Sequence, residues 1–191
     1  MTTGAVAACF EPLRHKLDEA VLANGADEIT QRVKAALVET LRTEGLSLPE
    51  AFTQPRSDSY ARRLLHADPA GRYTAVVMTW GPGQGTPLHD HAGIWCVECV
   101  VDGDMEIRQY DLVEEKDGVF RFQPQPCMEA HKGSAGCLIP PFEYHTLSNR
   151  RPSDPSITLH IYGGEMDHCH VFEPADDGSY RREEKKLSYH S

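Results

Sequence analysis

Three histidines form the part of this sequence best suited to chemistry. His89 and His91 flank Asp90, and His145 follows far downstream. On an extended strand, residues two apart project from the same face, so both imidazoles can reach one ion while Asp90 points away and is not expected to be a ligand. Histidine ligands suit iron, zinc, copper or nickel, and three protein ligands leave positions open for other molecules. The sequence therefore predicts a catalytic metal site assembled from two strands.

The residues around these histidines resemble the two motifs of the cupins. Gly83 lies six residues before His89, and Gly103 lies seven residues after Cys96. Cupins usually carry a glutamate ligand where this chain has Cys96, and its loss leaves three histidines, which resembles the thiol dioxygenase branch of the cupins. The second motif is echoed by Pro140, His145 and Asn149, with Phe142 where cupins usually have glycine.

Helix and strand patterns divide the chain into a helical segment and a barrel. Before residue 55, apolar residues recur every four positions and predict two amphipathic helices, followed by a turn or short helix at residues 48–52. From residue 59 onward, short apolar runs alternate with turn signals at the spacing typical of an antiparallel barrel or jelly roll. The runs expected as strands are 64–65, 73–80, 95–101, 105–112, 119–122 and 158–162.

These patterns predict a mainly β fold, a cupin jelly-roll β-barrel with N-terminal α-helices. We expect a single domain over residues 1–191, with a helical N-terminal segment at 1–55 and the barrel with its metal site at 59–191.

Composition narrows the class of partner and the compartment. The formal net charge of −10 and the lack of a clustered basic surface argue against binding to nucleic acid or an anionic membrane. A cytoplasmic location is expected, because the sequence has no membrane-spanning apolar stretch and no secretory signal.

Cys96 and Cys99 lie three apart on a predicted strand and face opposite sides, so neither a zinc knuckle nor a redox pair is expected. Most of the six cysteines, Cys9 among them, are expected to be small buried side chains or reduced thiols.

A strand after the third histidine gives a closer resemblance, to the cysteine dioxygenase family. In that family a Ser-x-His-x-Tyr strand lies beside a three-histidine iron. Here His160 and Tyr162 match it, and Thr158 replaces the usual serine. The resemblance implies a thioether between Tyr162 and Cys96, which lies five residues past the second histidine of the pair. Because Thr158, His160 and Tyr162 share one strand face, they are expected to form a hydrogen-bonded row. Trp95, just before Cys96, resembles the mercaptopropionate branch of the family.

The run that begins at Tyr60 is similar to the family's Tyr-x-Arg-x-Leu-Val, whose arginine holds the substrate carboxylate. This implies that Tyr60 and Arg62 contact the substrate, and a guanidinium suits a carboxylate because it can bind bidentately. Arg63 faces the other way and is expected in solvent. Cys169 either lines the pocket or fills the core. The tail at residues 187–191 resembles the family's C-terminal strand.

Some of these residues have structural alternatives. His160 is either a functional relay or a buried structural histidine, Tyr162 either joins the site or packs in the core, and Arg62 is either a substrate anchor or an ordinary exposed arginine. His168 and His170 are expected to be structural.

The resemblance implies an iron(II)-dependent thiol dioxygenase. Three neutral imidazoles leave a ferrous ion with a net positive charge, which would favour binding of a substrate thiolate. Arg62 would hold the carboxylate, and both atoms of dioxygen would pass to sulfur to give a sulfinic acid. Tyr162, hydrogen-bonded to His160, would place an acidic hydroxyl beside the oxygen or the carboxylate.

The choice of substrate, and a second class of function, stay open at this point. L-cysteine is the leading substrate, and 3-mercaptopropionate and mercaptosuccinate are alternatives that need different carboxylate anchors. A non-redox cupin, either a metal-binding module or an isomerase, is the alternative from another class. The expected partners are a small thiol and dioxygen. The sequence does not predict the oligomeric state, and a monomer is compatible with it.

Overall fold

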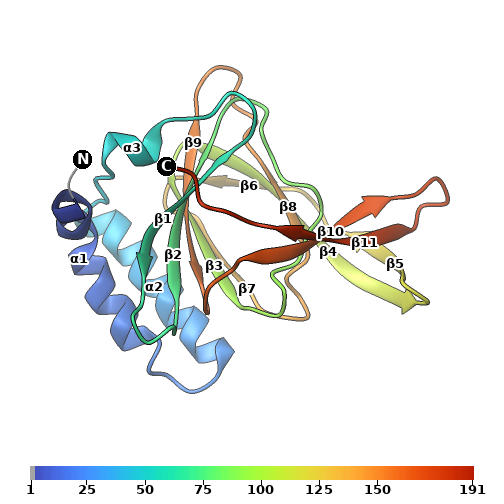
Figure 1. Ribbon diagram of the computed structural model, residues 1–191, viewed down its shortest axis with the longest axis horizontal. Coiled ribbons are helices and arrows are strands. Elements are labelled where there is room, and N and C mark those ends of the chain that lie inside the picture. Colours follow the sequence, from blue (N-terminus) through green and yellow to red (C-terminus); the bar gives the residue numbers. More distant parts are fainter. Residues whose placement is uncertain (1–2) are drawn as a thin grey trace.

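Two long helices and one short helix precede a sandwich of two antiparallel sheets, which confirms the predicted fold class (Figure 1). The computed structural model describes the backbone of residues 3–191 and the side chains of residues 10–191, so Cys9 lies outside the described side chains. The helices are α1 (Thr3–Ala20), α2 (Ala26–Thr43) and the short α3 (Glu50–Thr53). The strands are β1 (Ala61–Ala67), β2 (Thr74–Trp80), β3 (Cys96–Asp102), β4 (Asp104–Lys116), β5 (Val119–Pro124), β6 (Met128–His131), β7 (Ala135–Leu138), β8 (His145–Ser148), β9 (Ser156–Tyr162), β10 (His168–Pro174) and β11 (Tyr180–Lys186).

The helices form because their apolar residues gather on one face, which packs against a sheet. Leu17 of α1 and Leu37 of α2 share a buried cluster with Val97, Leu159 and Ile161 of the sheet. Burial of this apolar surface is the main force that holds the helical segment on the barrel. Within the described residues, no helix is long and apolar enough to cross a membrane.

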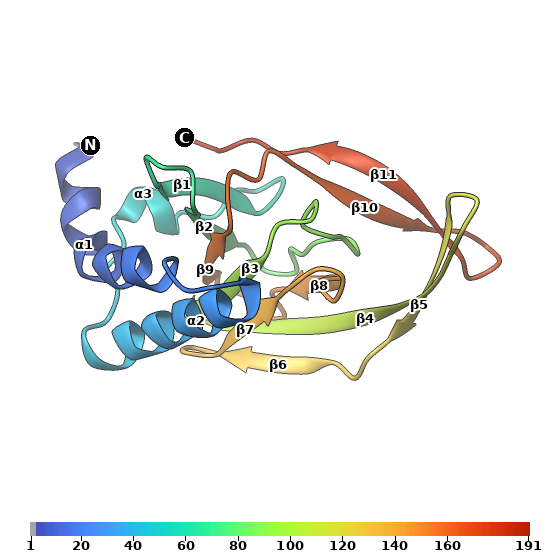
Figure 2. The same cartoon turned by 90° about the horizontal axis from the view of Figure 1, so that it is seen from below.

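The first sheet has the strand order β1-β2-β9-β3-β7, and the second has β10-β11-β5-β4-β6, with β8 paired to β4. Strands β2 and β9 are buried along their whole length. The reason is visible in Figures 1 and 2: helices cover one face of the first sheet, and the second sheet covers the other. Alternate residues of these strands therefore point either toward the helices or into the barrel. The candidate site lies on the barrel side of the first sheet.

Several strands lack the apolar runs that predict strands. β6 and β7 are short edge strands, and β11 consists of exposed charged residues after its first residue, Tyr180. The expectation of a strand at residues 187–191 is wrong, because the last strand ends at Lys186. The tail instead crosses β1, where the His190 backbone N–H donates to the Arg62 carbonyl at 2.7 Å and His190 Nδ1 accepts from the Arg62 N–H at 3.0 Å.

Candidate metal centre

The three histidines meet inside the barrel. One nitrogen from each of His89, His91 and His145 lies within 4.8 Å of the others, and all three side chains are buried. His145 begins β8, and its backbone exchanges two hydrogen bonds of 3.3 Å with the backbone of His89. This pairing brings the two distant parts of the chain together and fixes the spacing of the imidazoles.

Backbone carbonyls orient two of these rings. Nδ1 of His89 lies 3.1 Å from the Pro87 carbonyl, and Nδ1 of His145 lies 2.8 Å from the Glu143 carbonyl, so each Nδ1 carries the proton and each Nε2 is free for a metal. Within the described residues, the buried His145 Nε2 and His91 Nδ1 have no hydrogen-bond partner. Burial lowers the pKa of all three histidines, so they are neutral, the form that binds metal. This donor set fits a divalent transition metal such as ferrous iron.

Asp90, between the paired histidines, points away from the group and supports it from outside. Its carboxylate accepts hydrogen bonds of 2.8 Å from both the backbone N–H and the Nδ1–H of His170, and one of 3.0 Å from the Ala92 N–H. The contacts fasten β10 to the histidine pair. His170 therefore has a structural role, and Asp90 is outside the group of candidate ligands.

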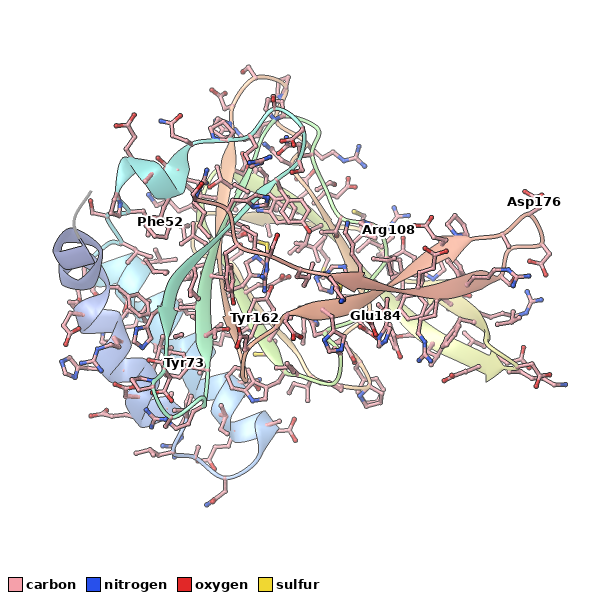
Figure 3. The ribbon with its side chains drawn as sticks, viewed as in Figure 1. Phe52, Tyr73, Arg108, Tyr162, Asp176 and Glu184 are labelled. Carbon is pink, nitrogen blue, oxygen red and sulfur yellow. The ribbon has the colours of Figure 1, made fainter. Side chains whose placement is uncertain are left out.

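The facing residues of β3 and β9 form the wall beside the histidines. Cys96 lies directly opposite Tyr162, and Glu98 lies directly opposite His160. Tyr162, labelled near β9 in Figure 3, has its ring centroid 6.0 Å from that of His91. Burial raises the pKa of both the Cys96 thiol and the Tyr162 phenol, so both groups hold their protons. The phenol can therefore donate a hydrogen bond, and it is not an unusually acidic group.

The expected hydrogen-bonded row is present only in part. Thr158 Oγ1 lies 2.7 Å from His160 Nε2, but the rings of His160 and Tyr162 stack at a centroid distance of 5.9 Å. The bond between these two rings was therefore wrongly predicted. Both ring nitrogens of His160 face other groups: Nε2 faces Thr158, and Nδ1 lies 3.6 Å from Glu98 Oε2. Cys96 Sγ also lies 4.0 Å from Nδ1. The indole N–H of Trp80 donates to Thr158 Oγ1 at 2.9 Å. An indole can only donate, so the Thr158 hydrogen is directed at His160 Nε2, and the His160 proton is placed on Nδ1.

Glu98 is the site residue that sequence reasoning missed. Its Oε2 lies 3.6 Å from His160 Nδ1 and 3.7 Å from His145 Nε2, and burial raises the pKa of Glu98 to about 8. The cupin motif places its glutamate at the position of Cys96 and assigns no role to residue 98. Strand alternation gives the missing signal, because Glu98 is two residues further along β3 and must face the same way as Cys96.

The histidines open onto a small cavity that continues outward. An inner cavity of about 30 Å³ is lined by the three histidines and, among others, by His160, Tyr162, Arg62, Tyr60 and Cys169. An outer cavity of about 190 Å³ shares Tyr60 and Arg62 with it. Tyr60 is held by stacking on Trp80 at a centroid distance of 4.5 Å. Cys169 both lines this cavity and belongs to the buried apolar cluster of the barrel, so its two expected roles are not exclusive.

Arg62 is held rigidly at the junction of the two cavities. One guanidinium nitrogen donates to the Met166 carbonyl at 2.7 Å, and the group lies over the Tyr189 ring at 4.6 Å from its centroid. The side chain is only 3% exposed, so the reading of Arg62 as an ordinary surface residue is wrong. A buried guanidinium with free donors is a strong anchor for a carboxylate.

Arg63 and Trp95, which follow Arg62 and precede Cys96 in the sequence, do not line the inner cavity. Arg63 faces the other way, as alternation predicts, but it is 7% exposed, so its expected place in solvent is wrong. The N-terminal segment covers that face of the sheet, where Thr79 donates a hydrogen bond to the Phe52 carbonyl. Trp95 packs with the cluster between the sheet and the helices, and its indole fills the space beside Gly163. Trp95 therefore does not contact a substrate in the inner cavity.

A model of the family described as cysteine dioxygenase type I matches residues 5–175. The chain belongs to the cysteine dioxygenase type I family. Two curated relatives in the family are cysteine dioxygenase type 1 of Rattus norvegicus, 22% identical, and of Homo sapiens, 20% identical, each over 86% of this chain and 79% of the relative. Membership makes the protein an enzyme of the non-haem dioxygenase class. Among solved structures, a double-stranded β-helix protein from Klebsiella pneumoniae is 18% identical, with a TM-score of 0.46 over 64% of this chain and 94% of that chain.

Proposed function

We propose that this enzyme is an iron(II)-dependent thiol dioxygenase whose preferred substrate is L-cysteine. The reaction joins one thiol and one dioxygen, with both oxygen atoms added to sulfur, to give cysteine sulfinic acid. One observation carries the proposal: a single small cavity is lined both by three neutral imidazoles and by a buried guanidinium, that of Arg62. A thiol with a carboxylate a few bonds away matches both kinds of group.

The roles of the metal and of Arg62 follow from this arrangement. Ferrous iron, when held by His89, His91 and His145, supplies the redox chemistry between thiol sulfur and dioxygen. Arg62 binds the substrate carboxylate and thereby sets the position of the sulfur relative to the histidines. Because Met166 and Tyr189 already fix the guanidinium, little conformational entropy is lost when the substrate binds.

His160 and Tyr162 act from the wall of the cavity. The protonated Tyr162 phenol donates a hydrogen bond to the carboxylate or to a developing negative charge on oxygen. His160 stays neutral, because burial lowers its pKa to about 3, and Thr158 sets the direction of its ring. Tyr60 and Cys169 complete the wall and exclude water from the reacting sulfur.

A thioether between Cys96 and Tyr162 is a further part of the proposal. The two residues are direct cross-strand partners, a relationship that places their Cβ atoms about 4.5–5.5 Å apart. The bond joins the sulfur to a ring carbon of the tyrosine, and two hydrogen atoms with their electrons pass to dioxygen, which is reduced to peroxide. The bond would hold the phenol in place beside the substrate.

Mercaptosuccinate is a second candidate substrate, and the outer cavity favours it. Lys185 and Lys186 line that cavity together with Arg62. Lys185 lies directly opposite Cys169, a wall residue of the inner cavity. A second carboxylate could therefore pair with a lysine while Arg62 holds the first. Lys185→Gln and Lys186→Gln should each leave turnover of L-cysteine intact and weaken that of a dicarboxylate thiol if the dicarboxylate is the true substrate.

Oxygen consumption by the iron-loaded and zinc-loaded protein, measured with a panel of small thiols, tests the proposal. We expect L-cysteine to give the highest rate, and only with iron. A preference for 3-mercaptopropionate would show that the substrate amine is dispensable. If the purified protein prefers zinc and consumes no oxygen with any thiol, the proposal is wrong and the alternative, a non-redox cupin, is favoured.

We also propose a cytoplasmic location, which the five free cysteines of the described region support.

A further inference from the structure

A second cavity, which Arg62 does not line, reaches residues that contact the metal centre. It has a volume of about 190 Å³ and lies between β3 and β7 of the first sheet and β4 and β6 of the second. Its walls are mostly apolar, with Val100, Met105, Ala130 and Leu147 all buried in one cluster. Met128, half exposed, also lines it. The cavity therefore connects the surface to the interior of the barrel.

The cavity exists because of a glycine and a gap between strands. β6 and β7 follow each other in sequence but are edge strands of different sheets, so no ladder of hydrogen bonds closes the space between them. Gly136 of β7 lies directly opposite Glu98. A Cβ built at Gly136 would meet nothing within 4 Å. Glycine within a strand lowers stability and often marks a place that a ligand approaches closely, so its presence here calls for a functional reason.

The inner end of this cavity touches the residues that support the metal centre. Leu147 lines both this cavity and the one that contains the three histidines. Glu98 and Thr158 also line it, and they contact His145 and His160 at 3.7 Å and 2.7 Å respectively. One leucine side chain and these two residues are thus the partition between the cavity and the metal centre.

The lining excludes the thiol substrate and suits a small apolar molecule. The carboxyl side chains on its walls are those of Glu98 and Glu129, and the lining residues include no lysine, arginine or histidine that would attract a carboxylate. Apolar cavities of about 150 Å³ stay dry and take up apolar guests such as xenon. We propose that this cavity is the route and holding site for dioxygen, while the thiol enters past Arg62. The inference rests on the proposed dioxygenase function, which makes dioxygen the second substrate.

Gly136→Leu tests the proposal because it fills the cavity from a position with free space. We expect the KM for oxygen to rise several-fold while the KM for the thiol and the iron content stay unchanged. Gly136→Ala is the matched control: it makes the same backbone change but adds one carbon, so it should behave like the parent. Ala130→Leu fills the cavity from β6 and gives a second reading if Gly136→Leu does not fold.

Xenon binding tests the proposed cavity without a measurement of activity. Crystals of the parent protein under xenon should show an atom between Gly136, Ala130 and Leu147, and crystals of Gly136→Leu should not. Unchanged oxygen dependence in a folded, filled variant, or xenon absent from this cavity in the parent, would overturn the proposed route and leave the dioxygenase function intact. A parent that consumes no oxygen with any thiol would instead overturn the function, and with it the role assigned to the cavity.

Discussion

Cys96 and Tyr162 lie directly opposite each other across β3 and β9, and both are buried. We predict that iron, dioxygen and substrate turnover together produce a thioether between them. Intact-mass and peptide mapping should show the loss of two hydrogen atoms and a linked pair of peptides. Cys96→Ser and Tyr162→Phe should each abolish the mass change and retain measurable dioxygenase activity, because the bond tunes the site and does not create it. Only free Cys96 after prolonged turnover would refute the bond.

Replacement of any one of the three clustered histidines should abolish both iron retention and turnover. Two imidazoles hold a ferrous ion too weakly against water, so His145→Ala protein should contain little iron by elemental analysis. His170→Gln is the control, since His170 lies close by but bonds to Asp90 and is not in the metal group. It should retain most of its iron. Full iron occupancy in His145→Ala would disprove the ligand assignment.

Arg62→Ala should keep its iron but lose roughly two orders of magnitude in kcat/KM for L-cysteine, because charge-assisted hydrogen bonds of about 1.5–3 kcal/mol are removed from a buried site. Cysteamine has no carboxylate and serves as the matched control substrate. It should be a poor substrate of the parent and should be little affected by the change. Equal losses for cysteine and cysteamine would show that Arg62 supports the fold and does not bind the carboxylate.

Asp68 links the barrel to the helical segment and should make stability depend on pH. Arg72 donates two hydrogen bonds of 2.8 Å to its carboxylate and also reaches Asp18 of α1 at 3.1 Å. The Arg72 hydrogen bonds hold the pKa of Asp68 well below its usual value. The stabilisation is therefore complete above the unfolded-state pKa of about 3.9 and is lost as the pH falls through the lower folded-state pKa.

Asp68→Asn should accordingly lower the Tm by on the order of 5 °C at neutral pH, with a gap from the parent that narrows below about pH 4. Thermal unfolding followed by circular dichroism measures this. Asp58→Asn, which removes an exposed ion pair with Arg56, should change the Tm little. Because helices and sheet share one core, we expect a single transition, as for one domain. Two separate transitions would contradict that expectation.

The sequence predicted the parts of the fold that local patterns encode. The helices and the strands with apolar runs follow from periodicity, and strand alternation places Cys96, His160 and Tyr162 on one face. Strands β6 and β7 were not predicted, because they are four residues each and partly exposed. β11 carries only charged residues after its first position, and its pairing with β10 is a tertiary fact that local sequence does not encode.

The candidate site was predictable as far as strand faces and family motifs reach. Contacts between strands decide the rest. The two ring nitrogens of His160 face Thr158 on its own strand and Glu98 on the neighbouring strand, so the predicted bond between His160 and Tyr162 is absent. Arg63 was placed in solvent because alternation gives the direction of a side chain but not what covers that face. Strand alternation predicts that Glu98 faces the site, but the cupin motif considers only the position of Cys96 for a glutamate.

The fate of labelled oxygen tests the proposed reaction most directly. The iron-loaded enzyme should turn over L-cysteine under ¹⁸O₂, and mass spectrometry of the product should find both labelled atoms in one sulfinic acid, with one oxygen consumed per thiol. Zinc-loaded protein should form none. Oxygen consumption that yields only cystine, or a sulfinate that carries label from water, would contradict dioxygenation at this three-histidine centre.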